Sequence, residues 1–469
     1  MRTSAPRELS AGAARRARRA SPVARARRAV LDDLFPQAPE RLVGAGEVAA
    51  YVVAFVALIA ASVLRQTGVG ALDTIWAEDG VIFLDRALEA TLPDAVGEGY
   101  AGYLHVVPRI AAEVVSLVPL ARAATATTLA AAGIVAAGAL LVYAASAGHL
   151  RSRPLRSLLA AVVVVHPLVA VESLNALALV QWPLTYAAFW LALWRPARTL
   201  NAVLAGIALF LIMVSAPLAV IVVPVLLVRV LVVPGWRDRV PALLFAVGLA
   251  VQVWAALTQP SPSPPTPGGT PAELAAVYRI LVATPGMFGF ALAENLRVAA
   301  EEVVGVLALA GWAVVVATAL LPGMQHRLTA LVAAVTSPVA MVIGVYARNS
   351  SPSVLAAYAQ GNRPAATRFA VVPALLLVTV LALALDRRPL RVVPPQAWRQ
   401  AGAIAMGALL MVCGMDYFVV NDRSGGPGWS PVIVEAVVAC RDGATEVRLQ
   451  TAPPVESWQF EVPCSALPP

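Results

Sequence analysis

Long apolar runs alternate with short polar loops along most of the chain. About 20 consecutive Ala, Val and Leu residues match the length of a helix that crosses a bilayer. By this rule the sequence predicts an all-α polytopic membrane protein with about eleven transmembrane helices. The predicted spans are 47–64, 126–148, 157–173, 178–194, 201–216, 217–233, 240–257, 303–321, 328–346, 369–385 and 401–420. Pro217 leaves the fifth and sixth spans the weakest, as a tight hairpin or one bent pair.

The arginines fall on alternate loops. One set of loops is short and basic, as the positive-inside rule expects of cytoplasmic loops. These loops hold Arg151, Arg153, Arg156, Arg195, Arg198, Arg237, Arg239, Arg327, Arg387, Arg388 and Arg391. With an odd number of spans, the N-terminus is then inside and the C-terminus outside. The prediction is a multi-pass protein of the cytoplasmic (plasma) membrane.

Composition agrees with this class and excludes others. The chain is 59% hydrophobic and only 13% charged, which is outside the range of soluble globular proteins. The net charge of +8 is concentrated in the N-terminal arm and the short loops, so it predicts topology and no nucleic-acid partner. Arg replaces Lys throughout, and Ala, Gly and Pro are abundant, which is typical of a high-GC bacterium.

Three regions differ in composition. Residues 1–40 carry clustered arginines without an apolar core and predict a disordered basic cytoplasmic tail near anionic lipid. Residues 41–420 form the transmembrane domain, with a first external loop at 65–125. A Pro-rich stretch at 260–267 predicts an extended spacer, and 273–302 is amphipathic and is expected at the membrane interface.

The segment 421–469 is polar and holds two of the three cysteines. Alternating apolar and polar residues predict a small extracytoplasmic β-rich unit. If it lies outside, Cys440 and Cys464 can form a disulfide, whereas Cys413 lies in an apolar span. The sequence has no CxxC motif or Cys/His cluster, so a structural metal site is not expected.

Candidate chemistry starts with Glu78 and Asp79, just after the first span. A carboxylate at the membrane surface can act as a general base or hold a divalent cation such as Mg²⁺ or Mn²⁺. Adjacent side chains point in different directions, so one can be catalytic and the other structural. The alternative is a solvated loop in which Asp79 caps a helix.

The same loop continues into Tyr103, His105 and Arg109. Pro108 can begin a helix, and Arg with a helix N-terminus favours a lipid phosphate or pyrophosphate. The alternative is that Arg109 reaches the headgroups while His105 is a packed polar residue.

Two further external segments carry candidate binding residues. Glu172 and Asn175 could bind substrate hydroxyls, and Trp182 offers a face to a sugar ring. The alternative is that the polar residues cap a helix at the membrane interface and that Trp182 belongs to the interfacial belt of aromatic residues. The loop at 347–368 holds Arg363 and Arg368 as candidate lipid-phosphate ligands, or as ordinary surface charge.

The acidic pair in the first external loop, the amphipathic segments, the number of spans and the late Arg-rich loop together resemble the GT-C superfamily of integral-membrane glycosyltransferases. The resemblance covers 47–420 in architecture but only short motifs in sequence. It implies that Glu78 or Asp79 is the catalytic base or metal ligand, and that Arg363 or Arg368 contacts a polyprenyl phosphate. The segments Trp76–Gly80 and Tyr100–Arg109 also resemble actinobacterial membrane proteins with no assigned substrate.

The leading hypothesis is inverting transfer of a hexose or pentose from a polyprenyl-phosphate donor to an envelope glycan or protein acceptor. Asp79 is the expected base, Glu78 supports it or a metal, and Arg109, Arg363 and Arg368 compensate the leaving phosphate. The alternatives are a transporter or flippase for lipid-linked glycans, a polymerase, and a non-catalytic scaffold. Spans almost free of charge and the lack of an internal repeat disfavour transport.

Overall fold

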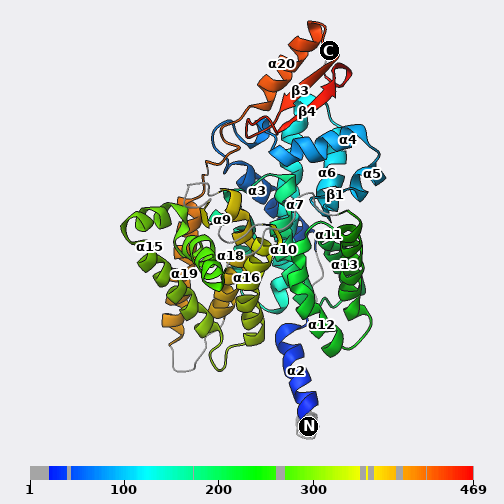
Figure 1. Ribbon diagram of the computed structural model, residues 1–469. Coiled ribbons are helices and arrows are strands. Elements are labelled where there is room, and N and C mark those ends of the chain that lie inside the picture. The colour runs from blue at the N-terminus through cyan, green and yellow to red at the C-terminus, as the bar shows by residue number, and fades with distance from the viewer. Residues whose placement is uncertain are drawn as a thin grey trace.

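The structure is a computed structural model, and its described residues are mostly helical (Figure 1). Two small sheets, each an antiparallel pair of strands, complete the described secondary structure. The residues that the structure describes are 21–39, 44–172, 174–259, 270–348, 355–356, 364–386, 394–418 and 420–467.

The helices form a bundle whose buried centre is α10 (Gln181–Leu193) and α18 (Pro364–Asp386). Within the described residues, nine helices are long and apolar enough to cross a membrane. The helices that supply most of them are α3 (Ala45–Val63), α7 (Ala123–Ala145), α8 (Arg153–Val165), α13 (Val240–Thr258), α15 (Thr284–Ala319), α16 (Arg327–Arg348), α18 (Pro364–Asp386) and α19 (Pro395–Met415). Three shorter apolar segments correspond to α10 (Gln181–Leu193), α11 (Thr199–Met213) and the pair η6 (Pro217–Val222) and α12 (Val223–Val232). The chain is therefore a multi-pass helical protein.

One segment differs from the sequence prediction. Pro271–Ala293, expected at the interface, is also apolar and long enough to cross. It comprises α14 (Pro271–Tyr278), a π-helical turn η8 (Arg279–Ala283) and the start of α15, which breaks at Gly289 with φ of 75°. Tyr278 in this segment faces the bundle, because its hydroxyl lies 2.7 Å from Ser337 Oγ. The number of polar residues in a segment does not indicate whether those residues have a partner inside the bundle.

Residues 22–34 of the N-terminal arm form a helix, although the sequence predicted a disordered tail there. Helix α2 (Pro22–Leu34) docks at the end of the bundle opposite the C-terminal unit (Figure 1). Asp33 accepts a hydrogen bond from the Thr329 backbone N–H at 3.0 Å, and His326 Nδ1 lies 3.0 Å from the Asp33 carbonyl. The partners that hold α2 lie far away in the sequence.

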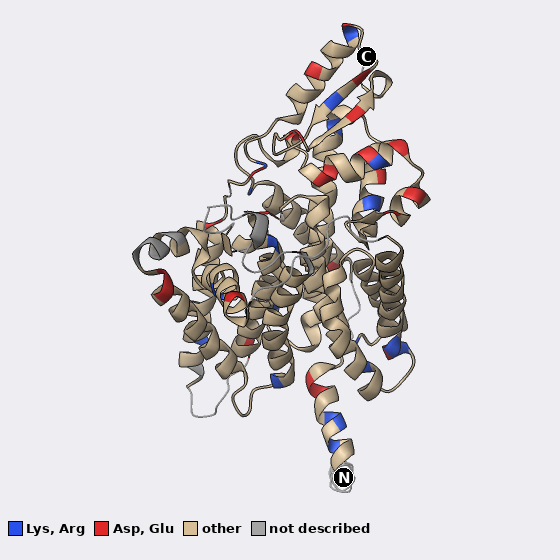
Figure 2. Ribbon diagram, viewed as in Figure 1, with Lys and Arg blue, Asp and Glu red and all other residues tan. Residues whose placement is uncertain are grey.

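The first external loop folds into short elements on top of the bundle. They are η1 (Ala71–Asp73), the π-helix η2 (Asp79–Leu84), α4 (Asp85–Glu89), α5 (Leu92–Gly97), β1 (Gly99–Tyr100), β2 (Tyr103–Leu104) and α6 (Val106–Ser116). Ala101 and Gly102 both have positive φ, so β1 and β2 form a two-residue hairpin that pairs Tyr100 with Tyr103. Figure 2 shows that acidic residues gather in this loop and in the C-terminal unit.

The C-terminal unit packs on this loop. It consists of α20 (Trp429–Arg441), β3 (Glu446–Gln450) and β4 (Gln459–Pro463), so helix contributes more than the β-rich expectation allowed. The predicted Cys440–Cys464 disulfide is present. Ala452 exchanges backbone hydrogen bonds with Ile75 and Ala77, at 2.9 and 2.8 Å, which ties the unit to the acidic segment.

We expect the Cys440→Ser, Cys464→Ser double variant to lower the free energy of unfolding of the C-terminal unit by about 3 kcal/mol, because the disulfide closes a loop with a sequence separation of 24. Limited proteolysis of purified protein measures this. Cys413→Ala, a buried thiol in α19, is the control. Equal protease resistance of wild type and double variant would refute a stabilising role.

Candidate functional site

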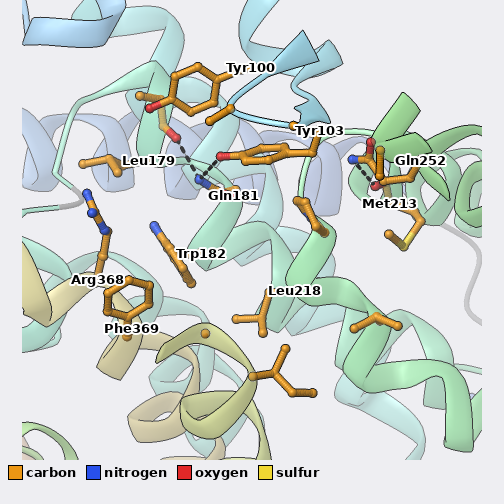
Figure 3. A pocket seen from close by; sticks show the side chains of 18 of the residues that line it. Tyr100, Tyr103, Leu179, Gln181, Trp182, Met213, Leu218, Gln252, Arg368 and Phe369 are labelled. Carbon is orange, nitrogen blue, oxygen red and sulfur yellow. Dashed lines mark hydrogen bonds between the residues drawn. The ribbon is translucent and has the colours of Figure 1, made fainter. Parts of the chain in front are cut away.

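A cavity of about 710 Å³ lies below the first loop, between α10, η6, α13, α16 and α18 (Figure 3). One part of its wall is polar and carries Glu78, Tyr100, Tyr103, Gln181 and Arg368. The rest is largely apolar. The apolar lining comes from Leu179, Met213, Pro217, Leu218, Val220, Leu249, Val253, Ala256, Ile343 and Phe369. The cavity is therefore amphipathic, with charge at one region of its wall.

Glu78 is the carboxylate in this wall. Its Oε1 accepts a hydrogen bond from the Tyr100 hydroxyl at 3.3 Å. Its Oε2 is buried and has no hydrogen-bond partner among the described residues. The backbone just before it is fixed by the pairing of Trp76 with Ala452. Glu78 is thus a cavity-lining carboxylate with one oxygen oriented by Tyr100 and one buried oxygen that lacks a partner among the described residues.

Asp79 lies on the other side of the chain and does not line the cavity. It is fully buried, and its two oxygens accept hydrogen bonds from the Leu177 and Ala178 backbone N–H groups, both at 2.8 Å. Burial raises its pKa to about 7, although the two N–H groups and nearby Arg423 oppose the rise. Its contacts are those of a positioning residue, in contrast to the catalytic role expected from the sequence.

Arg423 completes this anchor from the C-terminal side. Its guanidinium is fully buried and donates to Thr74 Oγ1 at 2.8 Å, to Thr128 Oγ1 at 2.8 Å and to the Ala71 carbonyl at 3.1 Å. It also donates to the Asn175 carbonyl at 2.6 Å. The first loop, the Asn175 turn and the C-terminal linker therefore meet at one side chain.

Asn175 belongs to the same scaffold. Its side chain accepts from the Ser62 hydroxyl at 2.7 Å and donates to the Ser62 carbonyl at 3.1 Å. Its φ of 56° is one that Asn tolerates better than most residues. It does not line the cavity, so the structure gives it a role in the turn and none in binding substrate hydroxyls.

Glu172 holds the Arg368 side chain in place. Its carboxylate pairs with Arg368 Nη1 at 2.7 Å and accepts from the Arg368 backbone N–H at 3.2 Å. Burial raises the pKa of Glu172 to about 7, and the charge of Arg368 opposes this. Arg368 projects into the cavity from the start of α18, near Trp182 and Phe369 (Figure 3). Arg368 thus lines the cavity, and Glu172 supports it without lining the cavity itself.

His105 supports the two tyrosines from behind. It is fully buried, with its ring nitrogens 2.6 Å from the Ser215 carbonyl and 2.9 Å from the Ala178 carbonyl. Its ring stacks on Tyr100 with a centroid distance of 5.7 Å and meets Tyr103 edge-on at 5.6 Å. Burial lowers the pKa of His105 to about 4, although the two carbonyls oppose this shift.

One expected phosphate ligand, Arg109, lies away from the cavity. Arg109 is buried over the Phe83 ring, and neither its Nε nor its Nη1 has a hydrogen-bond partner in the described structure. It does not line the cavity. Arg363 lies outside the described residues.

Trp182 does line the cavity, and its ring meets Phe369 edge-on at 5.5 Å. Tyr103 lines it as well and accepts a hydrogen bond from Gln181 Nε2 at 3.2 Å. Together these side chains offer aromatic faces and polar edges beside Arg368. A sugar ring needs both kinds of contact.

A divalent cation does not fit the residues present. Both Asp79 oxygens are engaged by backbone N–H groups, which leaves Glu78 as the free member of the acidic pair. Among the described residues no group of three His, Cys, Asp or Glu side chains could hold a metal.

Gln252 lies inside an apolar run of α13 and was not among the residues predicted from the sequence. Its amide accepts from the Leu104 N–H at 2.8 Å and donates to the Leu104 and Met213 carbonyls at 3.1 and 3.2 Å. It fixes β2, and through it Tyr103, against the bundle. The signal available in the sequence was a single amide side chain within an apolar span, where a polar group needs a partner.

The anchor role of Asp79 has a pH signature. Because its pKa is raised on folding, the stability that it contributes is present below the unfolded pKa of about 4 and is lost as the pH rises through about 7. We expect the wild type to lose thermal stability relative to Asp79→Asn between pH 4 and pH 7. Differential scanning fluorimetry at several pH values measures this, and parallel curves for the two proteins would contradict it.

The comparisons with known proteins contribute no relative. No family model matches the chain, and neither a curated protein nor a solved structure matches it.

Proposed function

We propose that this protein is a membrane glycosyltransferase that moves a sugar from a polyprenyl-phosphate donor to a hydroxyl of an extracytoplasmic envelope acceptor. The observation that carries the proposal is the pairing, in one amphipathic cavity, of a free carboxylate oxygen on Glu78 with the guanidinium of Arg368. The apolar walls suit the first isoprene units of the donor. The polar region suits its sugar and phosphate.

In this mechanism Glu78 is the base. Its Oε2 takes the proton of the acceptor hydroxyl as that oxygen attacks the anomeric carbon of the donor sugar. The bond between the anomeric carbon and the phosphate oxygen breaks, and the electron pair leaves with the polyprenyl phosphate. Arg368, held by Glu172, stabilises the charge that develops on this leaving group. Displacement from the opposite face inverts the anomeric centre.

The distribution of charge supports one-sided chemistry. The cavity's charged groups come from the first loop and the neighbouring start of α18, beside the C-terminal unit. The Arg-rich loops favour placing α2 inside and this face outside the plasma membrane. A flippase for lipid-linked glycans would require polar groups along a path across the bilayer.

A deletion strain complemented with wild type or with Glu78→Gln tests the proposal. We expect wild type alone to restore one sugar of the envelope glycan, because Gln cannot accept the acceptor's proton. Glu89→Gln, an exposed residue of the same loop, should restore it fully. Restoration by Glu78→Gln at equal expression would sink the glycosyltransferase assignment and favour transport or scaffolding.

A further inference from the structure

A second, smaller cavity lies at the opposite end of the molecule, where the N-terminal arm meets the bundle. Its volume is about 140 Å³, the space of roughly five water molecules. It is bounded by the end of the arm at Ala38, the start of α3 and the loop between α10 and α11. The Arg-rich loops that are expected to be cytoplasmic surround it.

Arg156 is the central charge of this cavity. It is 5% exposed and lies over the Tyr143 ring, with 4.6 Å from guanidinium carbon to ring centroid. Its Nε is buried without a hydrogen-bond partner. Among the described residues no carboxylate forms an ion pair with it. A buried guanidinium that has an unsatisfied N–H group and no carboxylate partner is costly, so an anion in the cavity would offset that cost.

The other polar groups of the wall also suit an anion. The indole Nε1 of Trp194 is buried and unpartnered, and an indole can only donate. Arg198 and Asn201 line the same cavity. Glu47 is a carboxylate among the lining residues, so the wall carries two guanidinium groups against one carboxylate. Phosphate oxygens accept from guanidinium and N–H donors together.

We propose that this cavity binds one phosphate-bearing ligand, either the headgroup of an anionic phospholipid or free phosphate. Arg156 and the Trp194 indole are its principal donors, and Arg198 adds charge at the wall. The site is independent of the catalytic cavity. It would bind its ligand at the junction of the arm, α7 and α8, next to the surface where positive-inside loops meet anionic lipid.

Native mass spectrometry of the purified full chain, titrated with phosphatidylglycerol or phosphatidylcholine, tests this site. We expect one phosphatidylglycerol to bind specifically, and Arg156→Gln to weaken that binding about 10-fold or more. Arg153→Gln is the matched control, because it removes an exposed charge from the same helix. It should leave binding within about 2-fold.

A parallel thermal-shift titration with inorganic phosphate identifies the source of the ligand. Stabilisation of wild type and not of Arg156→Gln by phosphate alone indicates free phosphate, and a response restricted to phosphatidylglycerol indicates a lipid. Glu47→Gln should strengthen binding of either. Equal losses in Arg156→Gln and Arg153→Gln, or none in both, would overturn the proposal. If Arg156→Gln does not fold, Trp194→Phe decides: unchanged binding in that variant would overturn it too.

Discussion

Glu78→Gln is expected to reduce sugar transfer about 100-fold or more, because the amide cannot accept a proton from the acceptor hydroxyl. Substrate binding and thermal stability should change little. Gln keeps the size of Glu and can still accept a hydrogen bond from Tyr100. The measurement is the initial transfer rate in membranes that contain equal amounts of each protein.

Two controls sharpen this prediction. Tyr100→Phe removes the hydrogen bond to Oε1 but leaves Oε2 as a base, so it should cost far less than Glu78→Gln. Asp79→Asn should lose activity in proportion to its loss of folded protein, because both Asp79 oxygens are bound to backbone N–H groups. A fully folded Asp79→Asn without activity, beside an active Glu78→Gln, would reverse the roles of the two residues.

Arg423→Gln is expected to destabilise the fold by about 3 kcal/mol or more. The substitution leaves buried carbonyl and hydroxyl acceptors of Ala71, Thr74, Thr128 and Asn175 without their donor. Each buried acceptor that loses its partner is costly. The measurement is the thermal unfolding midpoint in detergent, with the fraction of protein recovered as a monodisperse peak.

Arg448→Gln is the control for this variant. Arg448 is exposed on β3 and pairs with Glu461 at 2.8 Å, so its loss should not move the unfolding midpoint measurably. Arg423→Lys tests geometry, because an ammonium keeps the charge but cannot reach as many acceptors. A midpoint for Arg423→Gln equal to that of wild type would show that the linker is not a structural anchor.

The sequence predicted the apolar helices well because hydropathy depends on local composition. The amphipathic pattern of 273–302 predicted a location at the membrane interface, whereas Ser337 provides a partner for Tyr278 inside the bundle. The sequence also did not predict that helix α2 docks on the bundle, because this docking depends on distant residues. Its partners His326 and Thr329 lie about 300 residues away in the chain, and no local pattern reports such contacts.

In the candidate site, too, some features could be predicted from the sequence and others depend on contacts between distant residues. The sequence singled out Glu78, Tyr103, Trp182 and Arg368, and the structure brings all of these into one cavity. It could not decide which member of the acidic pair faces the cavity, since that depends on the Leu177 and Ala178 N–H groups. Nor could it reveal that Glu172 binds Arg368 or that His105 stacks on Tyr100.

The most direct test of the central claim is release of polyprenyl phosphate by purified protein. Wild type would be incubated with a lipid extract that contains polyprenyl-phosphate sugars and with an envelope acceptor fraction, and the lipid products followed by mass spectrometry. The account predicts that free polyprenyl phosphate appears together with a glycosylated acceptor, and that Glu78→Gln yields neither while remaining folded. Unchanged donor lipids with wild type, or equal release by Glu78→Gln, would contradict it.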